Sequence, residues 1–388
     1  MTRVLVTGSL GYIGSVLTPY LQANGYSCTG YDTGFFSGCL LYPPSDTVTF
    51  HHDARDITAA DLKQVDVVVH LAGISNDPMG KLDVSTIYDP TRAYSLAIAR
   101  LCKAHGVRFI FASSCSVYGL GSEALLTETS PTHPQTPYSL NKLQIEEDLR
   151  TISDKDFSPI ALRFATVFGR SPRLRFDVVV NMLTGMAAAN RTLVLNSDGS
   201  AWRPNVHILD ACQAVRRAIE LDYRGGELLV LNVGDEANNL QVLQMARIIQ
   251  NAVPGCTLKF LTENPELDAE GLIRDRKIKA GTDTRTYKVS FEKIRKVMPD
   301  FSCAWTVEQG VREMADLFQE LPLTQDTFKR RQFYRLQELE YLHEHGDLSD
   351  DLRWRVPQLS SQETDDLDRK STRLNSSHVS EFRMPSSA

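Results

Sequence analysis

Short apolar runs alternate with helix-length segments through the first half of the chain. Each run has the length and the residue types of a strand that is buried on both faces. Alternation of such strands with helices is typical of a parallel sheet covered by helices on both sides. We therefore predict an α/β fold with a doubly wound, Rossmann-type parallel sheet. The predicted strands are residues 3–7, 27–31, 65–70, 108–113 and 159–164.

The pattern changes after residue 169, where we expect a smaller α/β lobe that binds a substrate. Residues 170–176 are basic and aromatic, and residues 178–190 have the apolar spacing of a helix. A helix over 210–222 and an apolar strand over 228–233 then indicate a return to the main sheet. The two lobes are therefore expected to interleave along the chain.

Domain boundaries follow from these changes of pattern. We assign residues 1–169 and about 207–234 to the Rossmann domain, and about 170–206 and 235–320 to the substrate-binding lobe. In each lobe the two segments are separated in sequence and must meet in space.

The C-terminal part is interpreted separately. Residues 325–356 are expected to form a helical extension, with a charged amphipathic helix over 328–342. Residues 357–388 are polar and lack periodicity, so we expect a disordered tail. Residues 370–388 resemble translated vector sequence, and we exclude them from functional reasoning.

Composition narrows the class of protein. The net charge of −6 argues against nucleic acid as a partner, and 42% hydrophobic with 23% charged residues is the balance of a globular protein. No apolar run is long enough to span a membrane, and the first strand begins where a signal peptide would lie. Seven scattered cysteines without a Cys-x-x-Cys pair indicate a reducing, cytoplasmic setting and no zinc site.

A glycine-rich turn follows the first predicted strand, where a Rossmann unit binds its nucleotide. Gly8 permits the tight turn, Gly11 lets the backbone approach a diphosphate, and Gly14 lets the following helix pack closely on the strand. The unpaired N–H groups at the start of that helix favour phosphate. Asp32 ends the second strand and can accept hydrogen bonds from a ribose 2′-hydroxyl, whereas it would repel a 2′-phosphate. NAD is therefore favoured over NADP.

Tyr138 and Lys142 are four residues apart, a spacing that places both on one face of a helix. A tyrosine normally titrates near ~10, and each unit of lowering requires about 1.4 kcal/mol of preferential stabilisation of the phenolate. The Lys142 ammonium and an oxidised nicotinamide can together supply a few such units. Tyr138 is then a usable base at neutral pH.

Taken in order, these motifs resemble the extended short-chain dehydrogenase/reductases, in particular the NAD-dependent epimerase/dehydratase group that acts on nucleotide sugars. The resemblance runs from Thr2 to about Gly310. It implies NAD as cofactor, a nucleotide-diphosphate sugar as substrate, and a homodimer formed through the helix of Tyr138 and its neighbour. The motifs are the glycine turn, Asp32, Asp53, residues 70–73 (His-Leu-Ala-Gly), residues 113–119 (Ser-Ser-Cys-Ser-Val-Tyr-Gly), Tyr138 and Lys142.

The resemblance also implies roles for individual residues. Asp53 would meet the adenine amine, although residues 53–56 could instead form an ordinary polar turn. Ser114 would orient the reacting sugar hydroxyl beside Tyr138. The implied cofactor-binding residues are Gly8, Gly11, Tyr12, Ile13, Gly14, Asp32, Asp53, Ala54, Leu71, Ala72, Gly73 and Lys142.

For the substrate, Arg203 resembles the phosphate-binding arginine of the family, and Arg285 is a candidate second clamp on the diphosphate. Either arginine could instead be a solvated surface residue. Asn181 matches a family position near the nucleotide, and Thr166 stands where the family often has an Asn in the sugar pocket. The implied substrate-binding residues are Ser114, Tyr138, Thr166, Asn181, Arg203 and Arg285.

The residues after Ser114 bear on the type of reaction. Family members that dehydrate sugars have an acidic pair there, whereas this chain has Cys115 and Ser116, which argues against a 4,6-dehydratase. Cys115 is expected to be a packed thiol. The favoured reaction is epimerisation through a transient 4-keto sugar. The alternatives are an NAD(P)-dependent nucleotide-sugar reductase and, in another class, a non-catalytic NAD-binding scaffold or sensor.

Overall fold

The computed structural model describes residues 1–45, 49–74, 83–261 and 285–355. Residues up to Glu340 form one compact unit, and a second unit begins at Tyr341. The expected tail over 357–388 lies outside the described residues. None of the helices in the described ranges is both long and apolar enough to cross a lipid bilayer.

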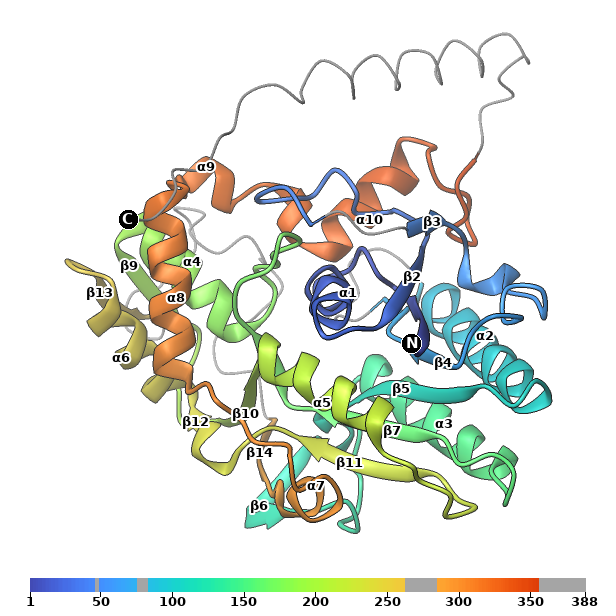
Figure 1. Cartoon of the computed structure of the whole chain (residues 1–388). Helices are drawn as coiled ribbons and strands as arrows, with labels where there is room; N and C mark the ends of the chain where they lie inside the picture. The colour runs from blue at the N-terminus through green and yellow to red at the C-terminus, as the bar shows by residue number, and fades with distance from the viewer. Residues whose placement is uncertain (46–48, 75–82, 262–284, 356–388) are drawn as a thin grey trace, which may run out of the picture. The chain divides into compact units, whose positions relative to one another are not determined.

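A parallel sheet forms the centre of the first unit (Figure 1). Within the described residues its order is β11-β7-β5-β4-β1-β2-β3, and every neighbouring pair is parallel. The strand order reverses between β1 and β4, and an open α/β sheet binds ligands at the carboxyl ends of the strands at such a point. The predicted fold class is confirmed. The strands are β1 (Arg3–Thr7), β2 (Ser27–Asp32), β3 (Thr49–His51), β4 (Val67–His70), β5 (Arg108–Ser114), β7 (Ile160–Phe164) and β11 (Leu229–Val233).

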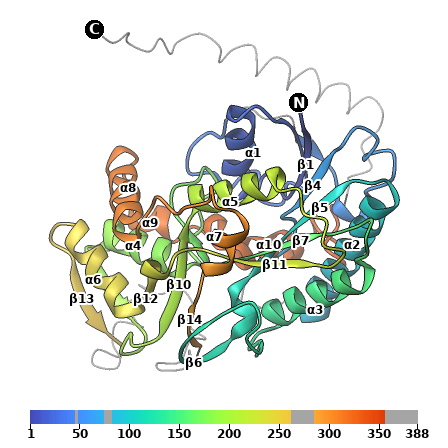
Figure 2. The same cartoon turned by 60° about the horizontal axis from the view of Figure 1, so that its bottom comes forward.

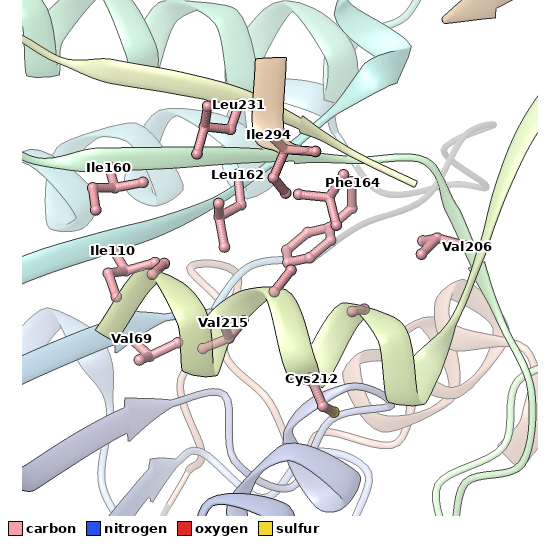
Figure 3. Packing of buried hydrophobic residues seen from close by; sticks show 14 of the residues in the cluster. Val69, Ile110, Ile160, Leu162, Phe164, Val206, Cys212, Val215, Leu231 and Ile294 are labelled. Carbon is pink, nitrogen blue, oxygen red and sulfur yellow. The ribbon is translucent and has the colours of Figure 1, made fainter. Parts of the chain in front are cut away.

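Two helical layers cover the sheet, as Figure 2 shows from a second direction. One layer contains α1 (Gly14–Ala23) and α5 (Ile208–Glu220), and the other contains α2 (Val84–Ala104) and α3 (Pro137–Ile152). Side chains alternate between the layers: Ile110 packs on the α5 side, while Phe109 and Phe111 pack on the α2 and α3 side. Figure 3 shows the α5 side, where Val215 faces strand residues such as Ile110. Burial on both faces explains why the strands are continuous apolar runs.

A second apolar cluster lies mainly among the residues predicted to form the smaller lobe, and it includes Tyr12 of the glycine turn. The main helices of that lobe are α4 (Val179–Asn190), α6 (Val242–Ala252) and α8 (Val307–Glu320), and α7 (Glu292–Val297) packs on β11. Three small sheets join segments that are distant in sequence: β12-β10-β8, β13-β9 and β14-β6. Their strands are β6 (Leu120–Leu126), β8 (Thr166–Phe168), β9 (Thr192–Leu195), β10 (Trp202–His207), β12 (Asn239–Gln241), β13 (Thr257–Phe260) and β14 (Thr286–Val289).

The helix predicted over 328–342 is not continuous. The chain forms α9 (Gln325–Phe328), a 3-10 turn over Arg331–Phe333 and then α10 (Arg335–Glu344). The interruption has a tertiary cause, because the carbonyl of Phe333 accepts a hydrogen bond from the N–H of Phe176 at 3.0 Å. The rings of Phe328 and Phe333 also pack on Phe176. These contacts override the helical periodicity.

Candidate active site

The glycine turn lies between the end of β1 and the start of α1. Gly8 has a φ of +78°, and its N–H donates to the carbonyl of Tyr31 at 2.8 Å. A Cβ on Gly8 would lie 2.8 Å from the backbone nitrogen of Ala72, and one on Gly14 would lie 2.7 Å from Cα of Ser9. Only glycine fits at either position. The turn thus keeps bare backbone at the sheet edge, as a diphosphate requires.

Asp32 lies at the end of β2, beside the glycine turn. Its Oδ2 accepts a hydrogen bond from the N–H of Leu10 at 3.0 Å, and its Oδ1 accepts one from the N–H of Gly34 at 2.8 Å. Burial raises the pKa of the carboxyl group, and the two N–H groups oppose that shift. Each carboxylate oxygen can accept a further hydrogen bond, so the group can still bind the hydroxyls of a ribose. The turn and Asp32 together fit the adenosine half of a dinucleotide.

Tyr138 and Lys142 both lie on α3, at the same sheet edge. Thr136 caps the helix through a reciprocal hydrogen-bond pair with Ser139, and Pro137 occupies its first turn. The Nζ of Lys142 donates to the carbonyl oxygen of Ala112 on β5 at 2.7 Å and lies 5.8 Å from the ring centre of Tyr138. Burial lowers the pKa of Lys142 to about 8, and Glu146 opposes this shift. A cation is therefore held near the Tyr138 ring, and its action on the acidity of the phenol remains a prediction.

The buried ammonium of Lys142 has a consequence for stability. Its folded pKa of about 8 is below its ordinary value of 10.5. Between these values the unfolded chain binds more protons, so the free energy of unfolding should rise with pH from about 8 to about 10.5. We expect this contribution to be on the order of 3 kcal/mol.

Lys142→Met provides the matched comparison, because it keeps an apolar stem and removes the charge. The variant should be more stable than the native chain at pH 7.5, and its advantage should shrink at pH 10. Urea unfolding of both proteins at the two pH values measures the difference. An advantage that does not change with pH would contradict the assignment.

Ser114 lies at the carboxyl end of β5, two residues after the Ala112 carbonyl that holds Lys142. Its Oγ accepts a hydrogen bond from the N–H of Ser116 at 3.1 Å and caps a short 3-10 turn over Cys115–Tyr118. The hydroxyl can still donate, so its predicted role toward a substrate remains open to test. Cys115 is buried and its thiol donates to the carbonyl of Arg163, as expected for a packed thiol.

A series of hydrogen-bonded side chains, which the sequence analysis did not predict, joins the ends of β1 and β4 to α2. His70 Nδ1 lies 2.7 Å from the Oγ1 of Thr7, and its Nε2 lies 2.9 Å from the Oγ of Ser95. Burial, and secondarily the charge of Lys142, lower the pKa of His70 to about 3, so the imidazole is neutral. The sequence signals were the position of His70 at the end of an apolar strand and its place in the motif of residues 70–73. These hydrogen bonds hold the carboxyl ends of β1 and β4 against α2.

Several other predicted cofactor-binding residues make hydrogen bonds within the protein. Asp53 caps the short turn Ala54–Asp56, and its carboxylate is paired with Arg55, so its side chain forms the polar turn of the alternative interpretation. The N–H groups of Leu71 and Ala72 donate to Thr7, at its carbonyl and its Oγ1. The contacts of Asp53, Ala54, Leu71, Ala72 and Gly73 with a dinucleotide remain predictions.

The hydroxyl of Tyr12 donates to the carbonyl of Gly169 at 2.8 Å, so this buried side chain links the glycine turn to the segment that follows β8. Ile13 precedes α1 as its N-cap residue. The backbone of both residues belongs to the glycine turn. Any contact with phosphate is therefore expected through the main chain.

The predicted substrate arginines lie together in the smaller lobe. The Nη1 of Arg203, on β10, donates to the carbonyl of Trp202 at 2.9 Å and also to the carbonyl of Arg285. Thr166 pairs with Asn205 across the β8–β10 ladder. The structure thus brings Arg203 and Arg285 side by side. Their binding to a diphosphate remains a prediction.

Asn181 has a different environment from the one the family position suggests. Its Oδ1 accepts a hydrogen bond from the N–H of Gly169 at 3.1 Å, and its Nδ2 donates to the hydroxyl of Tyr12 and the carbonyl of Arg175. The side chain is fully buried, and both amide hydrogens are engaged. Asn181 therefore holds the loop after Gly169 in place, while its Oδ1 can accept one further hydrogen bond, and its contact with a nucleotide remains a prediction.

Comparisons with known proteins bear on this site. Residues 4–234 match the model of the family described as NAD dependent epimerase/dehydratase. The chain is 28% identical to a protein of Bacillus subtilis named as an uncharacterized UDP-glucose epimerase, over 63% of this chain and 80% of that protein. It is 26% identical to a UDP-glucose 4-epimerase of Corynebacterium glutamicum, over 63% of this chain and 79% of that protein.

Solved structures share the fold. A UDP-glucuronic acid 4-epimerase of Bacillus cereus, in complex with UDP-glucuronic acid and NAD, superposes with a TM-score of 0.67 at 22% identity, over 82% of this chain and 100% of that one. An NAD-dependent NDP-hexosamine 5,6-dehydratase of tunicamycin biosynthesis gives a TM-score of 0.70 at 21% identity, over 82% and 98%. At these identities the likeness establishes the architecture.

Proposed function

Because the chain belongs to the NAD-dependent epimerase/dehydratase family, we propose that this enzyme is a nucleotide-sugar 4-epimerase that acts through a transient 4-keto sugar. NAD is its cofactor. The observation that carries the proposal is the pairing of Tyr138 with the buried ammonium of Lys142 at the sheet edge that also holds Asp32. The relative of Corynebacterium glutamicum is named as a UDP-glucose 4-epimerase, which supports the same reaction.

The chain's own groups can perform the proton chemistry. Tyr138 accepts the proton of the sugar 4-hydroxyl and later returns it, while Lys142 stabilises the phenolate. Ser114, two residues beyond the carbonyl that anchors Lys142, orients the same hydroxyl. Bound NAD supplies the complementary chemistry, reversible acceptance of a hydride from the sugar carbon.

We further propose that Arg203 and Arg285 bind the diphosphate of the substrate, supported by their adjacency on β10 and before β14. The absence of an acidic pair after Ser114, where Cys115 is buried, favours epimerisation over 4,6-dehydration. By the same resemblance we propose a homodimer through α2 and α3, on which Val84 and Leu140 are exposed apolar residues. A cytoplasmic location is proposed from the cysteine pattern.

A panel of nucleotide sugars tests the function. The panel contains UDP-glucose, UDP-galactose, UDP-glucuronic acid and their counterparts with other bases, each incubated with and without added NADH. We expect one pair of C4 epimers to interconvert without added NADH, as separated by chromatography. Turnover that consumes NADH stoichiometrically would instead identify the reductase. Bound NAD with no turnover of any sugar would favour the non-catalytic scaffold.

A further inference from the structure

An irregular segment follows β8. Residues 169–178 form neither helix nor strand, yet Ser171, Leu174 and Phe176 are fully buried. A buried segment without a hydrogen-bonded ladder of its own must satisfy its backbone through contacts with its neighbours. We call residues 169–176 the crossing segment, and its position depends on those contacts.

The crossing segment contacts the glycine turn. The Oγ of Ser171 donates to the carbonyl of Tyr12 at 2.9 Å, and it lies 3.1 Å from the Oγ of Ser15 in the first turn of α1. The hydroxyl of Tyr12 donates in turn to the carbonyl of Gly169. These bonds hold the crossing segment against the start of α1, where a Rossmann unit approaches the diphosphate of its cofactor.

The crossing segment also contacts the loop that follows Asp32. The N–H of Leu41 in this loop donates to the carbonyl of Pro172 at 2.8 Å. The guanidinium of Arg173 lies 4.5 Å from the ring centre of Phe36, a cation–π contact in the middle of the same loop. The crossing segment thus holds both elements that we expect to bind the adenosine half of the cofactor, the glycine turn and the loop next to Asp32.

The C-terminal part of the first unit packs on the crossing segment. Residues 324–340, which we call the C-terminal strap, place the ring centres of Phe328 and Phe333 at 4.8 and 5.3 Å from that of Phe176. The N–H of Phe176 also donates to the carbonyl of Phe333 at 3.0 Å. The strap therefore fixes the crossing segment three residues after Arg173.

The packing around Phe176 is close on a second side as well. Gly185 of α4 faces the same rings, and a Cβ there would lie 2.6 Å from the ring of Phe176 and 2.9 Å from that of Phe328. Closely packed side chains of this kind transmit displacement to their neighbours. A change in the strap is therefore expected to move Phe176, and with it the crossing segment.

We propose that the C-terminal strap positions the cofactor-binding loops and that Phe333 is its positioning residue. By fixing Phe176, the strap keeps the crossing segment closed on the glycine turn and on the loop after Asp32. This closure slows the dissociation of NAD. The inference rests on NAD as the cofactor. Its purpose, retention of the reduced cofactor between two hydride transfers, rests on the proposed epimerisation.

Three variants separate positioning from general stability. Phe333→Ala removes the ring that packs on Phe176, and Phe333→Leu keeps most of its apolar volume. Phe157→Ala is the matched control, because Phe157 is 4% exposed where Phe333 is 3% exposed, so each variant loses one buried ring. Phe157 precedes β7 and so lies at the amino ends of the parallel strands, whereas the cofactor site lies at their carboxyl ends.

Binding of NAD to nucleotide-free protein is the measurement. The apparent affinity falls with the fraction of molecules that are closed, so a Phe333→Ala variant that is closed one tenth of the time should bind NAD about 10-fold more weakly. Its NAD should also dissociate faster in a stopped-flow displacement experiment. Phe333→Leu should lose about threefold, because a smaller apolar side chain preserves part of the packing. Phe157→Ala should stay within about twofold of the native affinity.

Three results would overturn the proposal. The first is an NAD affinity and dissociation rate of folded Phe333→Ala within twofold of the native values. The second is an equal loss in Phe157→Ala, which would assign the effect to general destabilisation. The third is a loss of UDP affinity with unchanged NAD affinity, which would assign the strap to the substrate side.

Thermal midpoints of the nucleotide-free proteins provide the folding check. If Phe333→Ala does not fold, Phe333→Leu decides the question, and a native NAD dissociation rate in that variant contradicts the proposal. None of these measurements requires turnover of a sugar. The panel of nucleotide sugars tests the reaction separately, so either proposal can fail alone.

Discussion

Replacing Tyr138 with Phe is expected to lower kcat of the proposed epimerisation by about 10²- to 10⁴-fold, the range for loss of a positioned acid–base group. Phenylalanine preserves the ring beside Lys142, 5.8 Å from its ammonium, and removes only the oxygen that exchanges the proton. KM for the nucleotide sugar should change little. Initial rates with the sugar pair identified by the panel measure both constants, and the NAD content of the purified variant shows whether cofactor binding is intact.

Tyr223→Phe is the matched control, because this tyrosine follows α5 and loses the same single oxygen outside the proposed site. It should retain native kcat. If Tyr138→Phe also retains native kcat, with NAD bound and the fold unchanged, then Tyr138 is not the proton acceptor. A reaction with normal kcat and raised KM would assign Tyr138 to substrate binding instead.

The residue positions in the candidate site that sequence can predict are those fixed by local geometry. Helical periodicity alone puts Tyr138 and Lys142 on one face, and a turn between strand and helix alone requires Gly8. The continuous apolar strands were likewise predictable, because burial on both faces leaves a direct composition signal. Their parallel arrangement also follows from the βαβ pattern.

The remaining parts depend on contacts between distant segments. Thr7 and His70 are bonded across 63 positions, and nothing in the spacing of either residue indicates the other. The break before Arg335 arises because Phe333 bonds to Phe176, a contact that helical periodicity does not encode. Asn181 shows a third limit, since a family position does not reveal whether the amide is already used inside the protein.

A buried ion pair behind Lys142 fixes the helix that holds the proposed acid–base group. The Nη2 of Arg163, on β7, lies 2.6 Å from the Oε2 of Glu146, one turn after Lys142 on α3, and both side chains are almost fully buried. The hydroxyl of Ser113 also donates to Glu146, and Arg163 donates to the hydroxyl of Tyr118 at 2.9 Å. Because these partners come from β5, β7 and α3, the network sets the position of the helix relative to the sheet edge.

Glu146→Ala is therefore expected to destabilise the protein by about 3–5 kcal/mol, because it leaves the Arg163 cation buried without its carboxylate. Urea unfolding at pH 7 measures the loss. Glu292→Ala is the control, since Glu292 pairs with Lys296 on the exposed face of α7 and its removal should have no measurable effect.

The double variant Glu146→Leu with Arg163→Met separates the cost of an unpaired buried charge from the cost of lost side-chain packing. It removes both charges and keeps apolar volume, so it should recover most of the stability that Glu146→Ala loses. The negative charge of Glu146 raises the pKa of Lys142. Both Glu146 variants should therefore lower the pKa of Lys142 further, so that a smaller fraction of Lys142 is protonated near neutral pH. The pH–rate profile should shift accordingly. A double variant as unstable as Glu146→Ala would show that packing of the long side chains, and not the unpaired charge, dominates the cost.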